Sequence, residues 1–394
     1  MIDRGHQWGI PAVFMRGGTS KALVFKHSDL PQDQDLRRQI FLAAMGSPDA
    51  NGRQLDGMGG GVSSLSKVCI VGPASREDAD VDYTFVQIGI RDDVVDYSGA
   101  CGNMTSAIGP FAVDEGLVDA PGDGDMTVRI HATNMSKIIH ARFPVQNGRA
   151  EVSGARHIIG VAASAAGIRL DFIEPGNTQG SGLLPDGRGI MRLRWPDGNS
   201  VNATLVDSAN PCVFVRAEAL GLSGHESPDV LDADLTALQR LEHLRRAASV
   251  KIAVATDIEQ AGIIQSIPKI AIIAEPADYQ TLAGENIKAA SYDISVRMIS
   301  MGQAHRALPV TGGLCVATAA KLANTLVADI VSVADNKEVR IGTPSGVLDV
   351  NAVVDHALPD NPQVKQASIW RTARRLMEGL VLVPKEKLKR TTKE

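Results

Sequence analysis

Residues 95–113, with the sequence VDYSGACGNMTSAIGPFAV, place a cysteine between a short alternating segment and a run of small and apolar residues. The run has helical spacing, and we expect a helix from Asn103 to Gly116, where a glycine ends it. Cys101 would lie at the N-terminus of this helix, where unpaired backbone N–H groups and the helix dipole stabilise a thiolate. The same N–H groups are able to bind a substrate carboxylate. We therefore place the chemistry at Cys101 and its neighbours Gly102 and Asn103.

Bulk properties limit the class of protein. A chain of 394 residues exceeds the size at which a single hydrophobic core keeps growing, so two domains are expected. A net charge of −5 argues against nucleic acid or an anionic membrane surface as the main partner. No apolar run approaches the roughly 20 residues that span a bilayer, and we recognise no secretory signal. The four cysteines are far apart and lack metal-binding spacing, which predicts no metal site and a reduced, cytoplasmic protein. The basic tail, residues 385–393, is expected to be solvated.

The N-terminal part is expected to begin with two apolar strands within residues 10–25, joined by the turn RGGTSK at residues 16–21. Thr19 and Ser20 bring two hydroxyls into this turn, which is either a plain polar turn or a cradle of N–H groups for an anion. A helix should follow at residues 33–45. The glycine-rich residues 55–61 form a loop but match neither a phosphate-loop nor a dinucleotide-binding pattern.

Lys67 directly precedes an apolar run, residues 68–71, and so begins a strand. It is either the last polar residue before the strand becomes buried, or it projects into a cleft, where burial favours the neutral amine and makes it a usable base. The next strand alternates over residues 83–90. Lys67 and Cys101 each lie at the end of a strand, about one hairpin apart, which allows them to converge. The other cysteines, Cys69, Cys212 and Cys315, are expected to be buried small residues.

Several motifs follow one another in the order found in the PrpF family, which the chain resembles over nearly its whole length. They include RGGTSK at 16–21, GSPD at 46–49, LDGMGG at 55–60, DADVDYTF at 78–85, SGACGN at 98–103, GPFA at 109–112, DSANP at 207–211 and RTARRLMEG at 371–379. The resemblance implies a cofactor-independent isomerase that shifts or isomerises the C=C bond of a small unsaturated di- or tricarboxylate, such as methylitaconate, 2-methylaconitate or oxalomesaconate. It also implies an α+β fold like that of diaminopimelate epimerase, with two pseudo-symmetric lobes. Each lobe wraps a mixed sheet around a central helix, and the active site lies in the cleft between the lobes.

The chain departs from the family pattern at two places. Ala100 stands where members commonly have Asn before the catalytic cysteine, and LPDGR at residues 184–188 stands where a Pro-Thr-Gly-Asn segment is common. Both changes leave Lys67 and Cys101 in place. They therefore concern the substrate more than the reaction class.

The second half repeats the plan of the first. We expect a domain boundary near residues 196–202, which gives domains 1–198 and 199–394. Thr311-Gly312-Gly313 is expected to open a second small-residue helix, residues 314–326, as a pseudo-repeat of the helix after Cys101. Epimerases of this fold carry a cysteine at each helix start, whereas Cys315 would lie inside the second helix. A two-cysteine racemase is therefore disfavoured, and a Lys67–Cys101 pair suits an allylic proton shift.

Two sets of residues are candidates for holding substrate carboxylates. The main set consists of Thr19, Ser20, Gly102, Asn103, Thr311, Gly312 and Gly313, and a weaker set of Ser208, Asn210, Lys269 and His305. Two other functions stay open, an amino-acid racemase or epimerase on the same fold and a non-catalytic accessory protein of an aconitase-like hydratase. The oligomeric state is also open, and a homodimer or homotetramer is compatible with the sequence.

Overall fold

The computed structural model describes residues 1–388 except 98, 196–197, 265–266, 301, 332, 334–336 and 358–361. Ser98, Met301 and the end of the predicted basic tail therefore lie outside the described residues. The chain divides into two compact units. Unit 1 comprises Met1–Leu170 and Arg371–Glu394, and unit 2 comprises Asp171–Trp370.

This division differs from the expected boundary at residue 198. The C-terminal strand β22 (Ala373–Pro384) pairs antiparallel with β2 (Gln7–Gly17) from Gln7 opposite Pro384 to Gly17 opposite Ala373. Because this ladder ties the last strand to the first long one, residues 371–394 belong to unit 1. Strand pairing across the length of the chain has no local signal in the sequence, so the boundary could not be found from composition alone.

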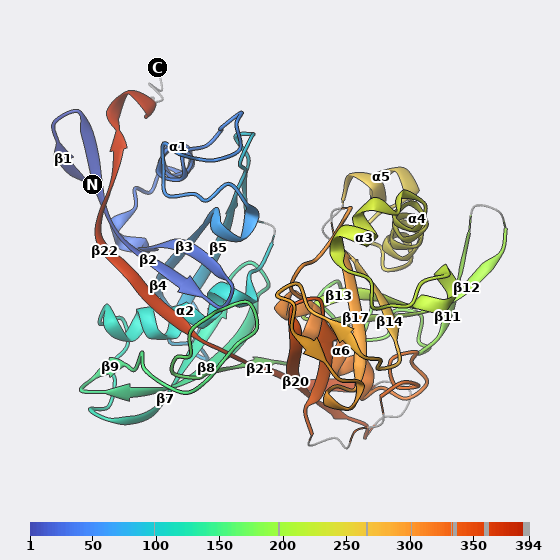
Figure 1. The fold of residues 1–394 in the computed structure, drawn as a ribbon. Helices are drawn as coiled ribbons and strands as arrows, with labels where there is room; N and C mark the ends of the chain where they lie inside the picture. Colours follow the sequence, from blue (N-terminus) through green and yellow to red (C-terminus); the bar gives the residue numbers. More distant parts are fainter. Residues whose placement is uncertain are drawn as a thin grey trace. The chain divides into compact units, whose positions relative to one another are not determined.

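Unit 1 is a mixed sheet with a helix on each face (Figure 1). Its remaining elements are β1 (Ile2–Arg4), β3 (Ser20–Lys26), η1 (His27–Asp29), α1 (Gln34–Met45), η2 (Ser63–Leu65), β4 (Lys67–Pro73), β5 (Val81–Ile88), β6 (Val95–Asp96), α2 (Gly102–Asp114), β7 (Gly124–Ala132), β8 (Lys137–Gln146), β9 (Arg149–Ala150) and η5 (Lys385–Lys387). The strand β10 (Ile168–Ile173) crosses the boundary between the units in sequence.

Alternation along the strands assigns the two faces of the unit 1 sheet. Leu23, Phe25 and Val68 pack in one hydrophobic cluster with the buried side of α1. Their immediate neighbours on the same strands, which include Lys67 and Cys69 on either side of Val68, point to the opposite face. That face carries α2, because a Cβ atom on Gly17 of β2 would lie only 2.8 Å from a backbone oxygen of α2. Lys67 and α2 therefore share one side of the sheet.

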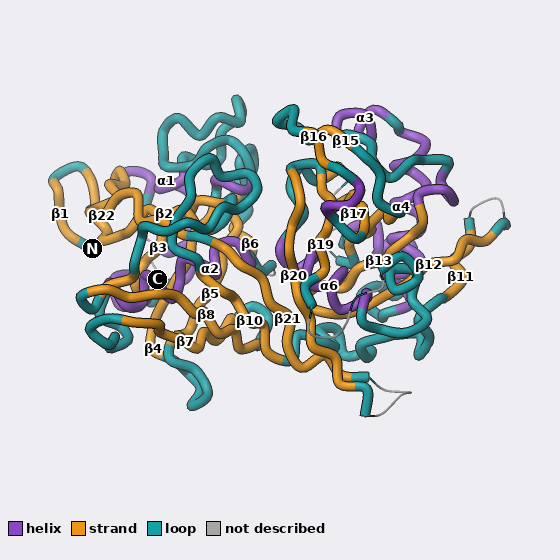
Figure 2. Tube along the Cα trace, turned by 60° about the horizontal axis from the view of Figure 1, so that its bottom comes forward, coloured by secondary structure: helices purple, strands orange, loops and turns teal. Residues whose placement is uncertain are grey.

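Unit 2 follows the same plan, with helices α3–α5 on one face of a mixed sheet and α6 on the other. Its elements are β11 (Met191–Arg194), β12 (Ser200–Ser208), β13 (Asn210–Arg216), η3 (Ala217–Leu220), α3 (Pro228–Ala233), α4 (Leu235–Lys251), α5 (Ile258–Ile263), β14 (Lys269–Ala274), β15 (Tyr279–Gln280), β16 (Asn286–Ile287), η4 (Ala289–Ser291), β17 (Ile294–Ser300), β18 (Gln303–Ala304), α6 (Val310–Ala320), β19 (Val339–Thr343), β20 (Gly346–Asp355) and β21 (Gln363–Arg371). Every residue of α6 is buried, and its small side chains let β12, β13 and β20 approach it closely (Figure 2).

The elements nearest the predicted chemistry match the sequence analysis closely. The helix expected at residues 33–45 is α1, capped by the Asp33 side chain and ended by Gly46 with a φ of 75°. The helix after Cys101 is α2. The second central helix differs, since α6 begins one turn before the expected residue 314 and ends at Ala320 rather than at residue 326. In unit 2, α3 ends and α4 begins at Asp234, whose side chain caps α4.

Candidate active site

Cys101 is the N-cap residue of α2, as the sequence predicts. Its backbone is extended, with a φ of −122°, and its carbonyl accepts the first helical hydrogen bond, from the N–H of Thr105. The N–H groups of Gly102, Asn103 and Met104 belong to the first turn and have no acceptor within the helix. The structure therefore places a partly exposed thiol beside three backbone donors and the positive end of the helix dipole.

The turn between β2 and β3 packs directly on this helix start. Gly18 and Thr19 form the turn, because Gly17 pairs with Ser20. Gly18 has a φ of 52°, and a Cβ atom there would lie 2.2 Å from Oδ1 of Asn103, so only glycine fits. The Gly18 N–H donates to the carbonyl of Thr372, 2.9 Å away. This N–H is thus not available to an anion, so Gly18 adds no donor to an anion cradle in the turn.

The Asn103 side chain links the turn to a buried arginine. Its Nδ2 donates to Oγ1 of Thr19 at 3.1 Å, and its Oδ1 accepts from Nε of Arg371 at 3.2 Å. Thr19 Oγ1 accepts this hydrogen bond, so the hydroxyl proton of Thr19 can be donated to another acceptor, such as a substrate carboxylate. Burial lowers the pKa of Arg371 to about 10, so the guanidinium remains charged at neutral pH. Arg371 adds positive charge behind the start of α2.

Lys67 is the first residue of β4 and only 8% exposed. Its Nζ donates to Oε1 of Gln87, 2.5 Å away, and lies 4.9 Å from the centre of the Phe85 ring. Both partners are on β5, the strand that pairs antiparallel with β4. The Lys67 side chain is therefore buried beside a polar group and is not solvated at a strand end, while its part in proton transfer stays a prediction.

The electrostatics of Cys69 and Tyr83 place Lys67 and Cys101 in one neighbourhood. Burial raises the pKa of the Cys69 thiol far above its usual range, the nearby Cys101 raises it further, and Lys67 lowers it. Burial also raises the pKa of Tyr83, and Cys69 and Cys101 add to the shift. Both predicted catalytic residues thus contribute to the pKa of Cys69. Its own thiol is fully buried and stays protonated, as expected for a packed cysteine.

A second group of predicted residues lies in unit 2, around Lys269 and His305. Burial lowers the pKa of the Lys269 ammonium group, which a nearby cysteine, Cys212, raises in part. Burial and the charge of Lys269 lower the pKa of His305 to about 4. Among the described residues, Nε2 of His305 has no hydrogen-bond partner although it is buried. An anionic ligand would relieve both features, because it would supply an acceptor and offset the buried positive charge.

The structure places the Ser208 side chain in the packed interior, whereas Asn210 is partly buried and its role in ligand binding stays a prediction. Ser208 is fully buried, and its Oγ lies 2.9 Å from Oγ1 of Thr318. Thr318 donates its own proton to the carbonyl of Leu314, so Ser208 must be the donor to Thr318 and has no proton for a carboxylate. The Asn210 side chain donates to the carbonyl of Pro211 at 3.2 Å.

The start of α6 also requires a correction. Its N-cap residue is Pro309, so the residue that corresponds to Cys101 is a proline. Thr311 and Gly312 lie in the first turn, but the N–H of Gly313 already donates to the carbonyl of Pro309 at 2.9 Å. Gly313 therefore cannot receive a carboxylate through its amide. Cys315 lies inside the helix and is buried, as predicted.

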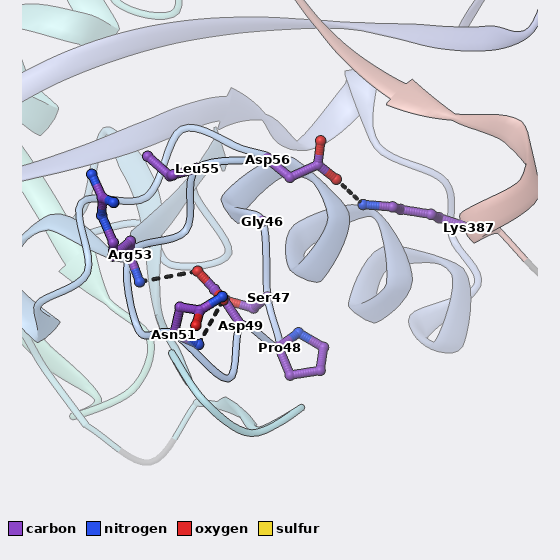
Figure 3. A pocket seen from close by; sticks show the side chains of 9 residues that line it. All are labelled: Gly46, Ser47, Pro48, Asp49, Asn51, Arg53, Leu55, Asp56 and Lys387. Carbon is purple, nitrogen blue, oxygen red and sulfur yellow. Dashed lines mark hydrogen bonds and ion pairs between the residues drawn. The ribbon is translucent and has the colours of Figure 1, made fainter.

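A cavity of about 650 Å³ in unit 1 is lined by none of the predicted residues. Its acidic groups are engaged by the protein itself, as Figure 3 shows. Asp49 accepts from the backbone N–H groups of Asn51 and Arg53, and Asp56 pairs with Lys387. This cavity lies beside the glycine-rich loop, and neither Lys67 nor Cys101 lines it. Within the described ranges, no three His, Cys, Asp or Glu side chains gather in a metal-binding arrangement.

Sequence reasoning missed Gln87, Phe85 and Arg371. The first two could have been found from strand register, because an antiparallel pairing of β4 and β5 sets Gln87 opposite Lys67. Arg371 begins the RTARRLMEG motif, but its contact with Asn103 had no local signal, since the two residues lie 268 positions apart in the sequence.

Two units that each wrap a mixed sheet around a buried helix, one of them capped by a cysteine, define the diaminopimelate epimerase-like class of α+β folds. A hydroxyproline epimerase from Agrobacterium vitis shares this fold, with a TM-score of 0.53 over 100% of this chain and 98% of that one at 11% identity.

The chain belongs to the PrpF protein family, whose model matches residues 7–384, and the predicted family and fold are thereby confirmed. The solved structure of a methylitaconate-delta-isomerase matches with a TM-score of 0.87 at 38% identity and covers 99% of both chains. The chain is 39% identical to a 3-methylitaconate isomerase of Eubacterium barkeri, over 97% of this chain and 99% of the relative. It is 37% identical to a 2-methyl-aconitate isomerase of Cupriavidus necator, over 95% and 97% of the two chains. It is 33% identical to a 4-oxalomesaconate tautomerase of Pseudomonas putida, over 96% and 98%.

Proposed function

We propose that this chain is an isomerase that moves or isomerises the C=C bond of a small unsaturated di- or tricarboxylate, with Lys67 and Cys101 as the proton-transfer pair. Relatives that match nearly the whole chain are named as isomerases or tautomerases of methylitaconate, 2-methylaconitate and oxalomesaconate. The observation that supports the proposal is that Lys67, at the start of β4, and Cys101, the N-cap residue of α2, lie on the same side of the unit 1 sheet, near the buried Cys69.

The start of α2 supplies what the reaction needs electrostatically. Removal of a proton from a carbon α or γ to a carboxylate generates a dienolate, whose negative charge must be stabilised in the transition state. The N–H groups of Gly102, Asn103 and Met104 form a fixed set of donors for a carboxylate, with Arg371 behind them. One member of the Lys67–Cys101 pair would take the proton and the other would return a proton to a different carbon. In unit 2, Lys269, His305, Thr311 and Gly312 are the proposed carboxylate-binding residues.

A racemase with one cysteine for each face of the substrate is not supported, because the start of α6 carries Pro309 where the start of α2 carries Cys101. The oligomeric state and the location in the cell remain predictions from the sequence. No helix in the described part of the chain has both the length and the hydropathy to cross a membrane.

The test is proton exchange in D₂O, followed by NMR. Methylitaconate, 2-methylaconitate and oxalomesaconate are the candidate substrates, and proline and 4-hydroxyproline are tested as substrates of the alternative racemase or epimerase reaction. We expect deuterium at allylic positions of one of the acids and none at the α-carbon of the amino acids. Lys67→Met should reduce kcat/KM on the identified substrate by at least about 100-fold, the low end for a general acid–base residue. Lys251→Met, which removes only an exposed ion pair with Asp186, is the matched control and should stay near wild type. Near-normal turnover by Lys67→Met would refute the assigned pair.

A further inference from the structure

The side chain of Gln87 is fixed at both ends. Its Oε1 accepts from Nζ of Lys67 at 2.5 Å, and its Nε2 donates to the backbone carbonyls of Ser66 at 3.0 Å and Ser63 at 3.2 Å. Because both carbonyls are acceptors only, the amide nitrogen must face them, and the amide oxygen must face Lys67. The opposite orientation would set an NH₂ group against the ammonium and an oxygen against two carbonyls.

We propose that Gln87 is a positioning residue that holds Lys67 on the α2 side of the sheet as an ammonium ion, so that Lys67 meets the substrate already carrying a proton. The role that this inference gives Lys67 in the reaction rests on the proposed function. The positioning of Lys67 by Gln87 rests only on the contacts of Gln87. It makes Lys67 the member of the pair that begins the reaction as the acid, and Cys101 the member that accepts the proton from carbon.

The surroundings of Lys67 favour a cation without neutralising it. The Phe85 ring faces Nζ at 4.9 Å, an arrangement that attracts a cation. Among the described residues, no carboxylate lies within ion-pair distance of Lys67. The titratable groups on the same side of the sheet are Cys69 on β4, Tyr83 on β5, Cys101 at the start of α2 and Asp96 on β6, which pairs with Gln87. A glutamate at position 87 would pair with the ammonium and cancel its charge. A glutamine accepts the same hydrogen bond and leaves the charge available to a substrate carboxylate.

The glycine-rich loop gains a role from this arrangement. Gln54 at its start is fully buried, and its Oε1 accepts from Oγ of Ser66 at 2.6 Å and from the N–H of Gly61 at 2.9 Å. Its Nε2 donates to Oγ of Ser47 at 2.9 Å. The loop thus fixes Ser66, whose carbonyl in turn fixes Gln87. Gln54 touches no atom of the Lys67 amine and is linked to Lys67 only through Ser66 and Gln87.

The test measures the protonation of Lys67 without any substrate. Wild type, Gln87→Met and Gln87→Glu are treated with an N-acetyl succinimide ester from pH 6 to 11, and acetylation of Lys67 is followed by peptide mass spectrometry, because only the neutral amine reacts. At a fixed pH on the rising part of the curve, Gln87→Met should acetylate about tenfold faster than wild type, since an acceptor for the ammonium is lost. Gln87→Glu should acetylate about tenfold more slowly. Lys251 in the same samples is the internal reference.

Opposite shifts distinguish positioning from a structural role, because general loosening of the strand would move both variants in the same direction. Curves that coincide with wild type, or that move together, would overturn the proposal. Should circular dichroism show that either variant does not fold, Gln87→Asn replaces it. Its shorter amide cannot reach Lys67 and Ser66 together, and its curve should move toward the Gln87→Met side, whereas an unchanged curve would overturn the proposal. In the kinetic experiment, the high-pH limb of the kcat/KM profile should move to lower pH in Gln87→Met and to higher pH in Gln87→Glu. If no unsaturated acid is turned over, the proposed function fails while the acetylation result still decides the role of Gln87.

Discussion

Asn103→Ala is expected to lower the free energy of unfolding of unit 1 by about 2–3 kcal/mol. The substitution removes a hydrogen bond to Thr19, worth about 1 kcal/mol, and one to the buried Arg371, worth about 1.5–3 kcal/mol because the donor is charged. Alanine has a higher helix propensity than asparagine, which returns up to about 0.7 kcal/mol. Most of the net loss therefore comes from the hydrogen bond to Arg371.

Urea unfolding followed by far-UV circular dichroism and tryptophan fluorescence measures this loss, with an unchanged m-value as the condition for comparison. Asn103→Asp is the matched control, since it keeps an acceptor for Arg371 and adds a negative charge that the helix N-terminus favours. It should lose about 1 kcal/mol or less, yet raise KM for a polycarboxylate through charge repulsion at the same place. A loss below about 0.5 kcal/mol in Asn103→Ala, or an equal loss in both variants, would refute the reasoning.

Three further predictions concern backbone space, pH and thiol access. Gly18→Ala should cost about 1–3 kcal/mol more than Gly5→Ala in urea unfolding, because both positions have positive φ but only a Cβ at Gly18 would collide with Asn103; equal losses would contradict the close approach. His305 has a pKa of about 4 in the folded protein, compared with an ordinary value of 6.5. Between these two pH values the histidine is protonated only in the unfolded chain. The free energy of unfolding should therefore fall by up to about 3 kcal/mol as the pH drops from 6.5 to 4. His305→Gln should flatten that part of the stability profile, and parallel profiles would show that another group is responsible. Iodoacetamide should alkylate Cys101 before the three buried cysteines, as peptide mass spectrometry would show, and a substrate-like acid should slow this reaction; preferential labelling of a buried cysteine would contradict the site.

Local patterns in the sequence were enough for the elements that carry Cys101 and Lys67. A cysteine before glycine and a run of small residues predicts an N-cap, because capping depends only on a few adjacent residues. The two strands and their turn at Gly18 followed from alternation and from glycine. The carboxylate-binding candidates of unit 2 were less well placed, since Ser208 packs against Thr318 and the Gly313 amide is bonded within α6.

The sequence by itself determined the family, the fold class and the two residues proposed to move the proton, because these depend on motif order and on local helix and strand signals. Only the tertiary structure decided what surrounds them. The register of β4 against β5 sets Gln87 against Lys67, and the return of the chain as β22 brings Arg371 and Thr372 to the start of α2. Side chains far apart in sequence meet through pairing and packing, which are set by the whole core and leave no periodic trace in either segment.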